Sequence, residues 1–181
     1  WEFLSAVPFA DHNAMLDPAC PDITGRVIEG LIASGVKPSH EAIRKGVQFL
    51  IKTQEADGSW YGRWGMNYIY GTWSVLCALN MAGVDHAAPE MRRAAAWLVS
   101  IQNEDGGWGE DGASYKLDYK GYEGSPSTPS QTAWALLGLM ATGDVDNPAV
   151  KRGVEYLQRT QSDDGFWSEA RYTATGFPRV F

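Results

Sequence analysis

Two charged residues near the beginning of the sequence have types and a spacing that could support acid chemistry. Asp22 and Arg26 lie four residues apart in a segment of helical character, so their side chains can meet on one helix face. A guanidinium stays charged at physiological pH and could orient a neighbouring acid and stabilise its charge. The same spacing suits an ordinary surface ion pair, and on spacing alone that is the simpler interpretation.

The other reactive residues exclude several kinds of site. Cys20 and Cys77 form no Cys-x-x-Cys pair, and His12, His40 and His86 are scattered. We therefore predict no metal site. Neither a phosphate-binding P-loop nor a Gly-x-Gly-x-x-Gly segment occurs, so no nucleotide and no other cofactor is expected. With 15 Lys and Arg against 22 Asp and Glu, the net charge of −7 argues against a nucleic-acid partner.

A threefold internal repeat indicates which elements position these residues. Each repeat ends in a glutamine, three residues, a glycine, one residue and a tryptophan, and the glutamines are 48 and then 59 residues apart. An aromatic–leucine pair precedes each glutamine at a fixed distance. Such a period indicates stacked helical hairpins. The three segments are Gln54–Trp60, Gln102–Trp108 and Gln161–Trp167.

The repeated motif itself is interpreted as structural. A glutamine side chain can hydrogen-bond free backbone groups at a helix end, and glycine permits a tight turn. The tryptophan can stack over the glutamine amide. None of these roles involves catalysis.

Two helices of different character are predicted in each repeat. The upstream helix, near 22–35, 72–83 and 132–143, is apolar on nearly all sides, as expected of a helix buried on two faces. It ends at a glycine, which is typical of helix C-termini.

The downstream helix of each repeat is amphipathic instead. In 41–52, Ile43, Val47, Leu50 and Ile51 fall on one face. An inner ring of apolar helices inside an outer ring of amphipathic ones predicts an all-α fold, namely an α/α barrel (toroid).

Only part of this barrel is predicted to be present. A closed toroid takes about six hairpins. Three are found here, with repeats at approximately 21–60, 70–108 and 128–167. The sequence also begins at Trp1 rather than at Met. Residues 1–181 are therefore expected to be the C-terminal part of one barrel domain, about half of it, in a longer protein.

Three segments carry a resemblance to a known family: 57–73 (DGSWYGRWGMNYIYGTW), 106–111 (GGWGED) and 127–140 (STPSQTAWALLGLM). With the repeats, they closely resemble the C-terminal part of bacterial squalene–hopene cyclases over nearly the whole chain. The resemblance implies an isomerase, a class II triterpene cyclase. Such an enzyme protonates squalene and directs a cascade of carbocations to hopene and hopanol.

The family's general acid lies in an Asp-x-Asp-Asp motif, which this sequence lacks. The resemblance places that motif upstream, so the chain alone is expected to be inactive. It also matches Asp22 and Arg26 to a pair that hydrogen-bonds the acid and tunes its proton. Some members have histidine at the second position, whereas Arg26 can act only as a fixed charge and hydrogen-bond donor.

Six further residues match positions along the path of the substrate. Four match aromatic residues that line the cavity, where a ring face stabilises a carbocation without attacking it. For any one of these aromatics, core packing is the alternative. Two others match a constriction between the substrate channel and the cavity. The residues are Trp64, Tyr70, Phe177 and Phe181 for the cavity, and Phe9 and Ala10 for the constriction.

The resemblance also implies the partners and the location. Squalene is the expected substrate. A membrane surface is contacted through missing parts of the parent protein, and a homodimer of the parent is compatible with the family. The expected location is the cytoplasmic side of the bacterial membrane, as a peripheral or monotopic protein.

Two other functions stay open on the residues alone. One is a non-catalytic α-toroid that serves as a binding or scaffold domain. The other is an α/α-barrel glycosidase, which uses paired carboxylates and aromatic platforms. The acidic residues fall mostly in the repeat loops, and this favours the cyclase.

Overall fold

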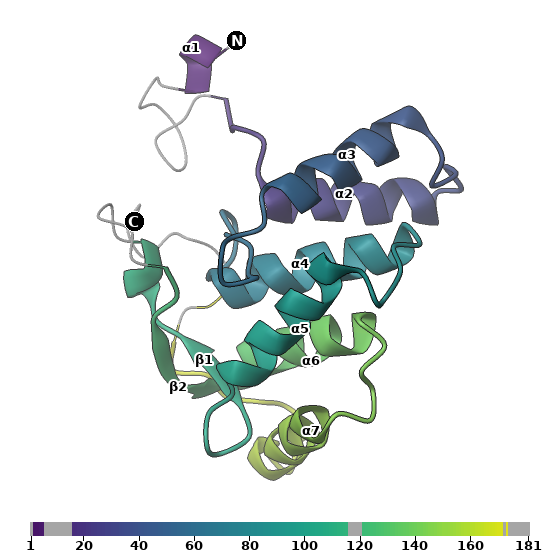
Figure 1. Cartoon of the computed structure of the whole chain (residues 1–181). Coiled ribbons are helices and arrows are strands. Elements are labelled where there is room, and N and C mark those ends of the chain that lie inside the picture. Colours follow the sequence, from purple (N-terminus) through teal and green to yellow (C-terminus); the bar gives the residue numbers. More distant parts are fainter. Residues whose placement is uncertain (1, 6–15, 116–120, 172, 174–181) are drawn as a thin grey trace.

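The helices form two rows (Figure 1) in a computed structural model that describes residues 2–5, 16–115, 121–171 and 173. In the inner row, the middle helix packs against both of its neighbours. A single helical turn near the N-terminus, α1 (Glu2–Ser5), stands apart from both rows. The inner helices are α2 (Pro21–Ala33), α4 (Tyr68–Met81) and α6 (Pro129–Ala141).

Each inner helix is followed in the chain by an outer helix that packs on it. The prediction of stacked helical hairpins, part of an α/α barrel, is therefore confirmed. The outer helices are α3 (Glu41–Lys52), α5 (Pro89–Ser100) and α7 (Pro148–Thr160).

The inner helices begin earlier than their sequence pattern suggests. Pro129 can open α6 because the first turn needs no backbone donor, and the Thr128 hydroxyl caps that turn. The predicted C-terminal glycines are confirmed, since Gly35, Gly83 and Gly143 have φ values of 91°, 82° and 81°.

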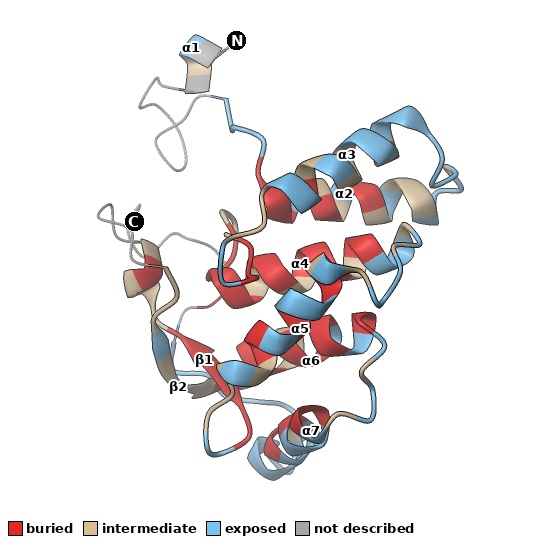
Figure 2. Cartoon of the chain, viewed as in Figure 1, coloured by how far each residue is buried: buried red, intermediate tan, exposed pale blue. Residues whose placement is uncertain are grey.

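Burial follows the two-row arrangement (Figure 2). Nine of the 14 residues of α4 are buried, whereas only Ile43 and Leu50 are buried among the 12 of α3. Val47 is half-buried, but Ile51 is 37% exposed, so its predicted place on the buried face is wrong. The packed face of α3 is narrower than the pattern indicated, because this outer helix touches the inner row on one side only.

The inner helix α2 also departs from the pattern. It was expected to be buried on two faces, yet Val27 is 53% exposed and Ile23 is 41% exposed. Within the described residues, α2 has an inner neighbour, α4, on one side only. Of the two faces of α2 that the sequence pattern predicts to be buried, only one is therefore buried within the described residues.

A small sheet is an addition to the expected all-α fold. Strands β1 (Trp108–Glu110) and β2 (Gly124–Thr128) pair antiparallel, with Trp108 opposite Thr128. A 3-10 helix, Gly112–Tyr115, lies between them. The sequence showed only extra length after the second repeat motif, because strands of three and five residues are too short for a clear alternating pattern.

The repeat motif joins consecutive hairpins. The Gln54 side-chain amide donates to the carbonyl of Gly58 and to that of Glu90 in α5, both at 2.9 Å. The indole of Trp60 donates to the carbonyl of Leu50 at the end of α3, at 2.7 Å. These contacts confirm the prediction that the motif satisfies backbone groups at helix ends.

Candidate active-site wall

Asp22 is fully buried although it carries a carboxylate. It lies in the first turn of α2, and its Oδ2 accepts the backbone N–H of Trp64 at 2.7 Å. Its backbone carbonyl accepts the hydroxyl of Ser74 at 2.9 Å, which ties α2 to α4. The other carboxylate oxygen, Oδ1, is buried with no hydrogen-bond partner within the described residues. A buried acceptor without a donor is costly, so Oδ1 can accept a further hydrogen bond.

Trp64 is held by a second carboxylate as well. Its indole N–H donates to Asp17 Oδ2 at 2.6 Å, and the neighbouring Arg63 donates to Asp17 Oδ1 at 2.8 Å. Backbone and ring of Trp64 are thus both bound to acidic residues. The sequence analysis missed Asp17, because it belongs to no repeat and lies 47 residues from Trp64.

Arg26 does not form the ion pair with Asp22 that their spacing permits. Its guanidinium pairs with Glu29, three residues further along α2. It also lies over the ring of Trp73 in α4, with Cζ 4.1 Å from the ring centroid. The physical reason is that the Asp22 carboxylate turns inward to the backbone of Trp64, whereas Arg26 stays half-exposed. The role of the two residues at the acid stays a prediction.

Tyr70 belongs to a cluster of three half-buried aromatic residues. Trp73 and Trp134 stack with centroids 5.8 Å apart and planes 8° apart, across the contact of α4 with α6. The Tyr70 ring meets both edge-on, at 5.5 and 5.1 Å. Arg26 lies over the Trp73 ring of this cluster of Tyr70, Trp73 and Trp134. The sequence analysis singled out Tyr70 alone.

The loop before α4 packs tightly onto Tyr70. A β-carbon at Gly65 would collide with the Tyr70 ring, so only glycine fits there. The hydroxyl of Tyr115 donates to the carbonyl of Gly62 at 2.8 Å and is also bonded to that of Gly65. The backbone of Gly65 therefore lies directly against the Tyr70 ring, and Tyr115 holds the loop there.

Glu110 is a buried carboxylate to which the sequence analysis assigned no role. It is 1% exposed and accepts the backbone N–H groups of Asn67, Tyr68 and Ile69, at 3.1, 3.0 and 3.0 Å. Glu110 therefore caps the N-terminus of α4. Burial raises its pKa to about 7, although the three N–H donors oppose the shift.

A sequence signal for this cap exists in the repeats. Glu110 follows Trp108 by two residues, and Glu169 follows Trp167 by the same interval. Glu169 accepts the backbone N–H of Ser130 in the first turn of α6, at 2.8 Å. A glutamate two residues after the repeat tryptophan thus caps the inner helix of the same repeat.

The surroundings keep the Tyr70 hydroxyl and the Cys20 thiol protonated. Burial raises the pKa of the Tyr70 hydroxyl, the charge of Asp22 raises it further, and Arg26 acts in the opposite direction. Burial, with Asp22 adding to the effect, raises the pKa of the Cys20 thiol to about 12. Neither group is a source of protons near neutral pH.

The remaining predicted site residues, Phe9, Ala10, Phe177 and Phe181, lie outside the described residues. Among the residues that are described, no three His, Cys, Asp or Glu side chains are grouped so that they could hold a metal ion. No helix in the described ranges is long and apolar enough to cross a bilayer.

The family model described as "Squalene-hopene cyclase C-terminal domain" matches residues 1–181. The chain belongs to this family. A squalene–hopene cyclase of Bradyrhizobium diazoefficiens is 63% identical over 99% of this chain, and one of Alicyclobacillus acidocaldarius is 46% identical over 97%. The chain covers only 27% and 28% of these two relatives, so it spans little more than a quarter of a squalene–hopene cyclase.

A solved structure shares the fold of this chain. The ent-copalyl diphosphate synthase of Streptomyces platensis matches 91% of the chain with a TM-score of 0.66, and the chain covers 31% of it. At 22% identity, this likeness concerns the fold alone. It supports the assignment of the helices to part of an α/α barrel.

Proposed function

We propose that this chain is the C-terminal part of a class II triterpene cyclase, which converts squalene to hopene and hopanol by protonation and a carbocation cascade. In this proposal the chain supplies support for a catalytic acid that lies elsewhere in the polypeptide. It also supplies aromatic rings along the cavity. The relatives whose names state a squalene–hopene cyclase activity support the substrate and the product.

The observation that carries the proposal is the free oxygen of Asp22. One oxygen of this buried carboxylate holds the backbone of Trp64, and the other has no donor within the described residues. A catalytic carboxylic acid would supply that donor, and its hydrogen bond to Asp22 would fix the position of the acid. Arg26, on the next turn of α2, adds a positive charge that helps two carboxyl groups to coexist.

The aromatic residues supply the second part of the function. A carbocation needs negative electrostatic potential without a nucleophile, and the faces of tyrosine and tryptophan rings provide it. Tyr70 meets Trp73 and Trp134 edge-on. Its raised pKa keeps the hydroxyl neutral, so the residue does not trap the cation as a phenolate would. Trp64 is held by Asp17 and Asp22.

Expression of the full-length polypeptide and of residues 1–181 alone tests this function. Detergent-dispersed squalene is supplied to both, and products are identified by gas chromatography with mass spectrometry. Hopene is expected from the full-length protein, and no product from residues 1–181, which lack the Asp-x-Asp-Asp acid. Turnover by residues 1–181 would show that the acid is not outside this chain.

We further propose that the parent protein works at the cytoplasmic face of the bacterial membrane, as a peripheral or monotopic protein. Squalene is too apolar to be delivered through water, and this supports a membrane source. Parts of the parent outside this chain would make the contact, and a homodimer of the parent is part of the same proposal. Flotation with liposomes and light scattering of the detergent-solubilised protein test the two points.

A further inference from the structure

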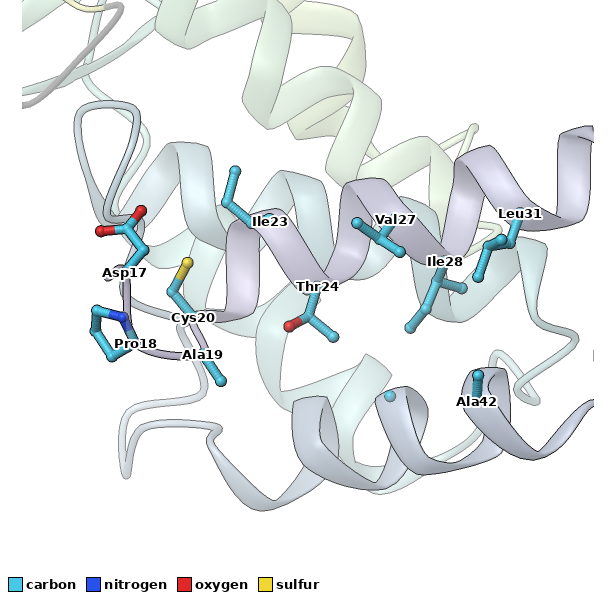
Figure 3. A pocket seen from close by; sticks show the side chains of 11 residues that line it. Asp17, Pro18, Ala19, Cys20, Ile23, Thr24, Val27, Ile28, Leu31 and Ala42 are labelled. Carbon is cyan, nitrogen blue, oxygen red and sulfur yellow. The ribbon is translucent and has the colours of Figure 1, made fainter. Parts of the chain in front are cut away.

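Asp17 lies in the segment that leads into α2, at one end of an apolar pocket whose lining side chains are seen in Figure 3. Both of its carboxylate oxygens bind the loop before α4. Oδ2 accepts the indole N–H of Trp64 at 2.6 Å, and Oδ1 accepts the Nε–H of Arg63 at 2.8 Å. The carboxylate therefore bridges two consecutive residues that lie 46 and 47 residues further along the chain.

The acceptor of the Trp64 indole differs from the acceptors of the repeat tryptophans. The indoles of Trp60, Trp108 and Trp167 donate to backbone carbonyls in the outer helices, at 2.7, 2.8 and 2.9 Å. These carbonyls are neutral acceptors, and the bonds join each motif to a helix. Trp64 donates to a carboxylate instead, and hydrogen bonds to an ionised group are shorter and about twice as strong. Its partner is therefore of a different kind from that of the structural tryptophans.

A negative charge at the N–H edge changes what the faces of the ring offer. An aromatic ring carries positive partial charge at its edge and negative partial charge on its faces. An anion that accepts the N–H polarises the hydrogen bond and shifts electron density toward the ring. The ring faces then attract a cation more strongly. Asp17 thus affects the electrostatics of the Trp64 ring as well as its orientation.

Two further contacts keep this arrangement in place. Arg63, whose side chain is 17% exposed, pairs with the oxygen of Asp17 that does not bind the indole. Asp22 accepts the backbone N–H of Trp64 at 2.7 Å, so ring and backbone are held by separate carboxylates. The charge at the ring edge is therefore in position before any cation forms, and no reorganisation is needed during the reaction.

We propose that Asp17 is a positioning residue of the cyclisation, which holds the Trp64 indole and strengthens the attraction of its ring for a carbocation. This inference rests on the proposed function, in which Trp64 faces the cation. Squalene is an uncharged hydrocarbon, so the charge of Asp17 acts on the cation and not on the bound substrate. Loss of that charge should therefore lower kcat and leave KM unchanged.

Asp17→Asn in the full-length protein tests the inference, because the amide keeps the size and an oxygen acceptor but removes the charge. With detergent-dispersed squalene, kcat is expected to fall about fivefold at unchanged KM, since a neutral hydrogen bond replaces a charge-assisted one. Asp144→Asn is the matched control. The Asp144 side chain is 24% exposed, against 33% for Asp17, and pairs with Arg92 at 2.8 Å. It should keep the kcat of the wild type, and an unchanged kcat in Asp17→Asn would overturn the inference.

Replacing Trp64 by Phe separates an effect through the ring from a general loss of structure. Phenylalanine has no N–H for Asp17 to accept. In the Trp64→Phe protein, Asp17→Asn should therefore cause no further fall in kcat. The same fivefold fall in both backgrounds would show that Asp17 acts through another group, and the inference would be wrong.

The indole N–H signal of Trp64 gives a measurement that needs no turnover. In nuclear magnetic resonance spectra of protein labelled with ¹⁵N-tryptophan, this signal is the one lost in Trp64→Phe. It should move to higher field in Asp17→Asn, because its hydrogen bond weakens, and stay in place in Asp144→Asn. An unmoved signal in Asp17→Asn would overturn the inference whether or not the protein cyclises squalene. Absence of hopene from the wild-type protein would instead contradict the proposed function, and with it the role at a carbocation.

Discussion

The backbone N–H of Trp64 donates a 2.7 Å hydrogen bond to the buried carboxylate of Asp22, which lies 42 residues earlier in the chain. This contact joins the two kinds of group that the proposed reaction needs. In the proposed function, Asp22 supports the acid and Trp64 is an aromatic side chain of the cavity. A single hydrogen bond therefore joins the inner helix α2 to the loop that carries Trp64.

Replacing Asp22 by Asn in the full-length protein should reduce kcat for squalene about a hundredfold, because the amide keeps an acceptor for Trp64 but loses the charge. The thermal unfolding midpoint should change little. Initial rates of hopene formation and calorimetry measure the two effects. Asp146→Asn, an exposed carboxylate in the loop before α7, is the control and should retain full activity. A near-normal rate for Asp22→Asn would contradict its role at the acid.

Replacing Trp134 by Leu should change the products rather than only the rate. Tyr70 loses a ring contact at 5.1 Å, and Trp73 loses the ring on which it stacks. Such aromatic pairs contribute about 0.5–1.5 kcal/mol each, so partly cyclised products should rise about threefold. Product fractions from gas chromatography measure this. Phe166→Leu, 71% exposed, should leave the fractions unchanged. An unaltered product ratio in Trp134→Leu would show that the cluster does not position Tyr70.

Glu110 should make stability depend on pH. Its pKa is about 7 in the folded protein and near 4.5 when unfolded. The folded state therefore binds the proton more tightly, and the contribution is complete below about pH 4.5 and is lost as the pH rises through 7. The shift corresponds to about 3 kcal/mol as an upper limit. Urea unfolding at a series of pH values between 4.5 and 8 measures it.

Two variants separate this effect from other titrating groups. Glu110→Gln should flatten the pH dependence in this interval, while lowering the free energy of unfolding because its amide group faces the N–H donors of α4. Glu169→Gln, the corresponding glutamate of the next repeat, is exposed and should keep the slope of the wild type. If Glu110→Gln kept that slope too, the assignment of the titration to Glu110 would be wrong.

Replacing glycine by alanine should lower the free energy of unfolding in the repeat motif and raise it in α2. Gly106 has a φ of 88°, and a β-carbon there would lie 2.7 Å from the carbonyl oxygen of Arg152, so Gly106→Ala should cost about 2 kcal/mol or more. Gly30 lies in α2 with nothing within 4 Å of such a carbon, and Gly30→Ala should stabilise by about 0.5–1 kcal/mol. Urea unfolding compares them, and equal effects would contradict this account.

Several features were predictable from the sequence because they depend on local periodicity. The repeat of glutamine, glycine and tryptophan specifies hairpins of the same construction, so the two rows of helices follow from it. The glycines that end the inner helices follow from backbone geometry alone. The family resemblance, carried by contiguous motifs, marked Asp22, Trp64 and Tyr70 among the site residues.

The contacts of those residues depend on segments far apart in the chain. Arg26 could reach either Asp22 or Glu29 by helix spacing, and only the packing of the loop near Trp64 turns Asp22 inward and leaves Arg26 to Glu29 and Trp73. Glu110 lies in a repeat loop of the sequence, and only the pairing of β1 with β2 and the packing of the repeats bring its carboxylate to the first turn of α4.

The sequence by itself determined the repeated hairpin and the motif that joins consecutive hairpins, because both are encoded within about 50 residues and recur. It also determined the family, because the motifs that carry the resemblance are contiguous. The tertiary structure alone decided which acid is buried and which ring Arg26 covers. Those outcomes depend on desolvation and packing between neighbouring repeats, and the free energy of a charge or a tryptophan ring is set by what the adjacent repeat places against it.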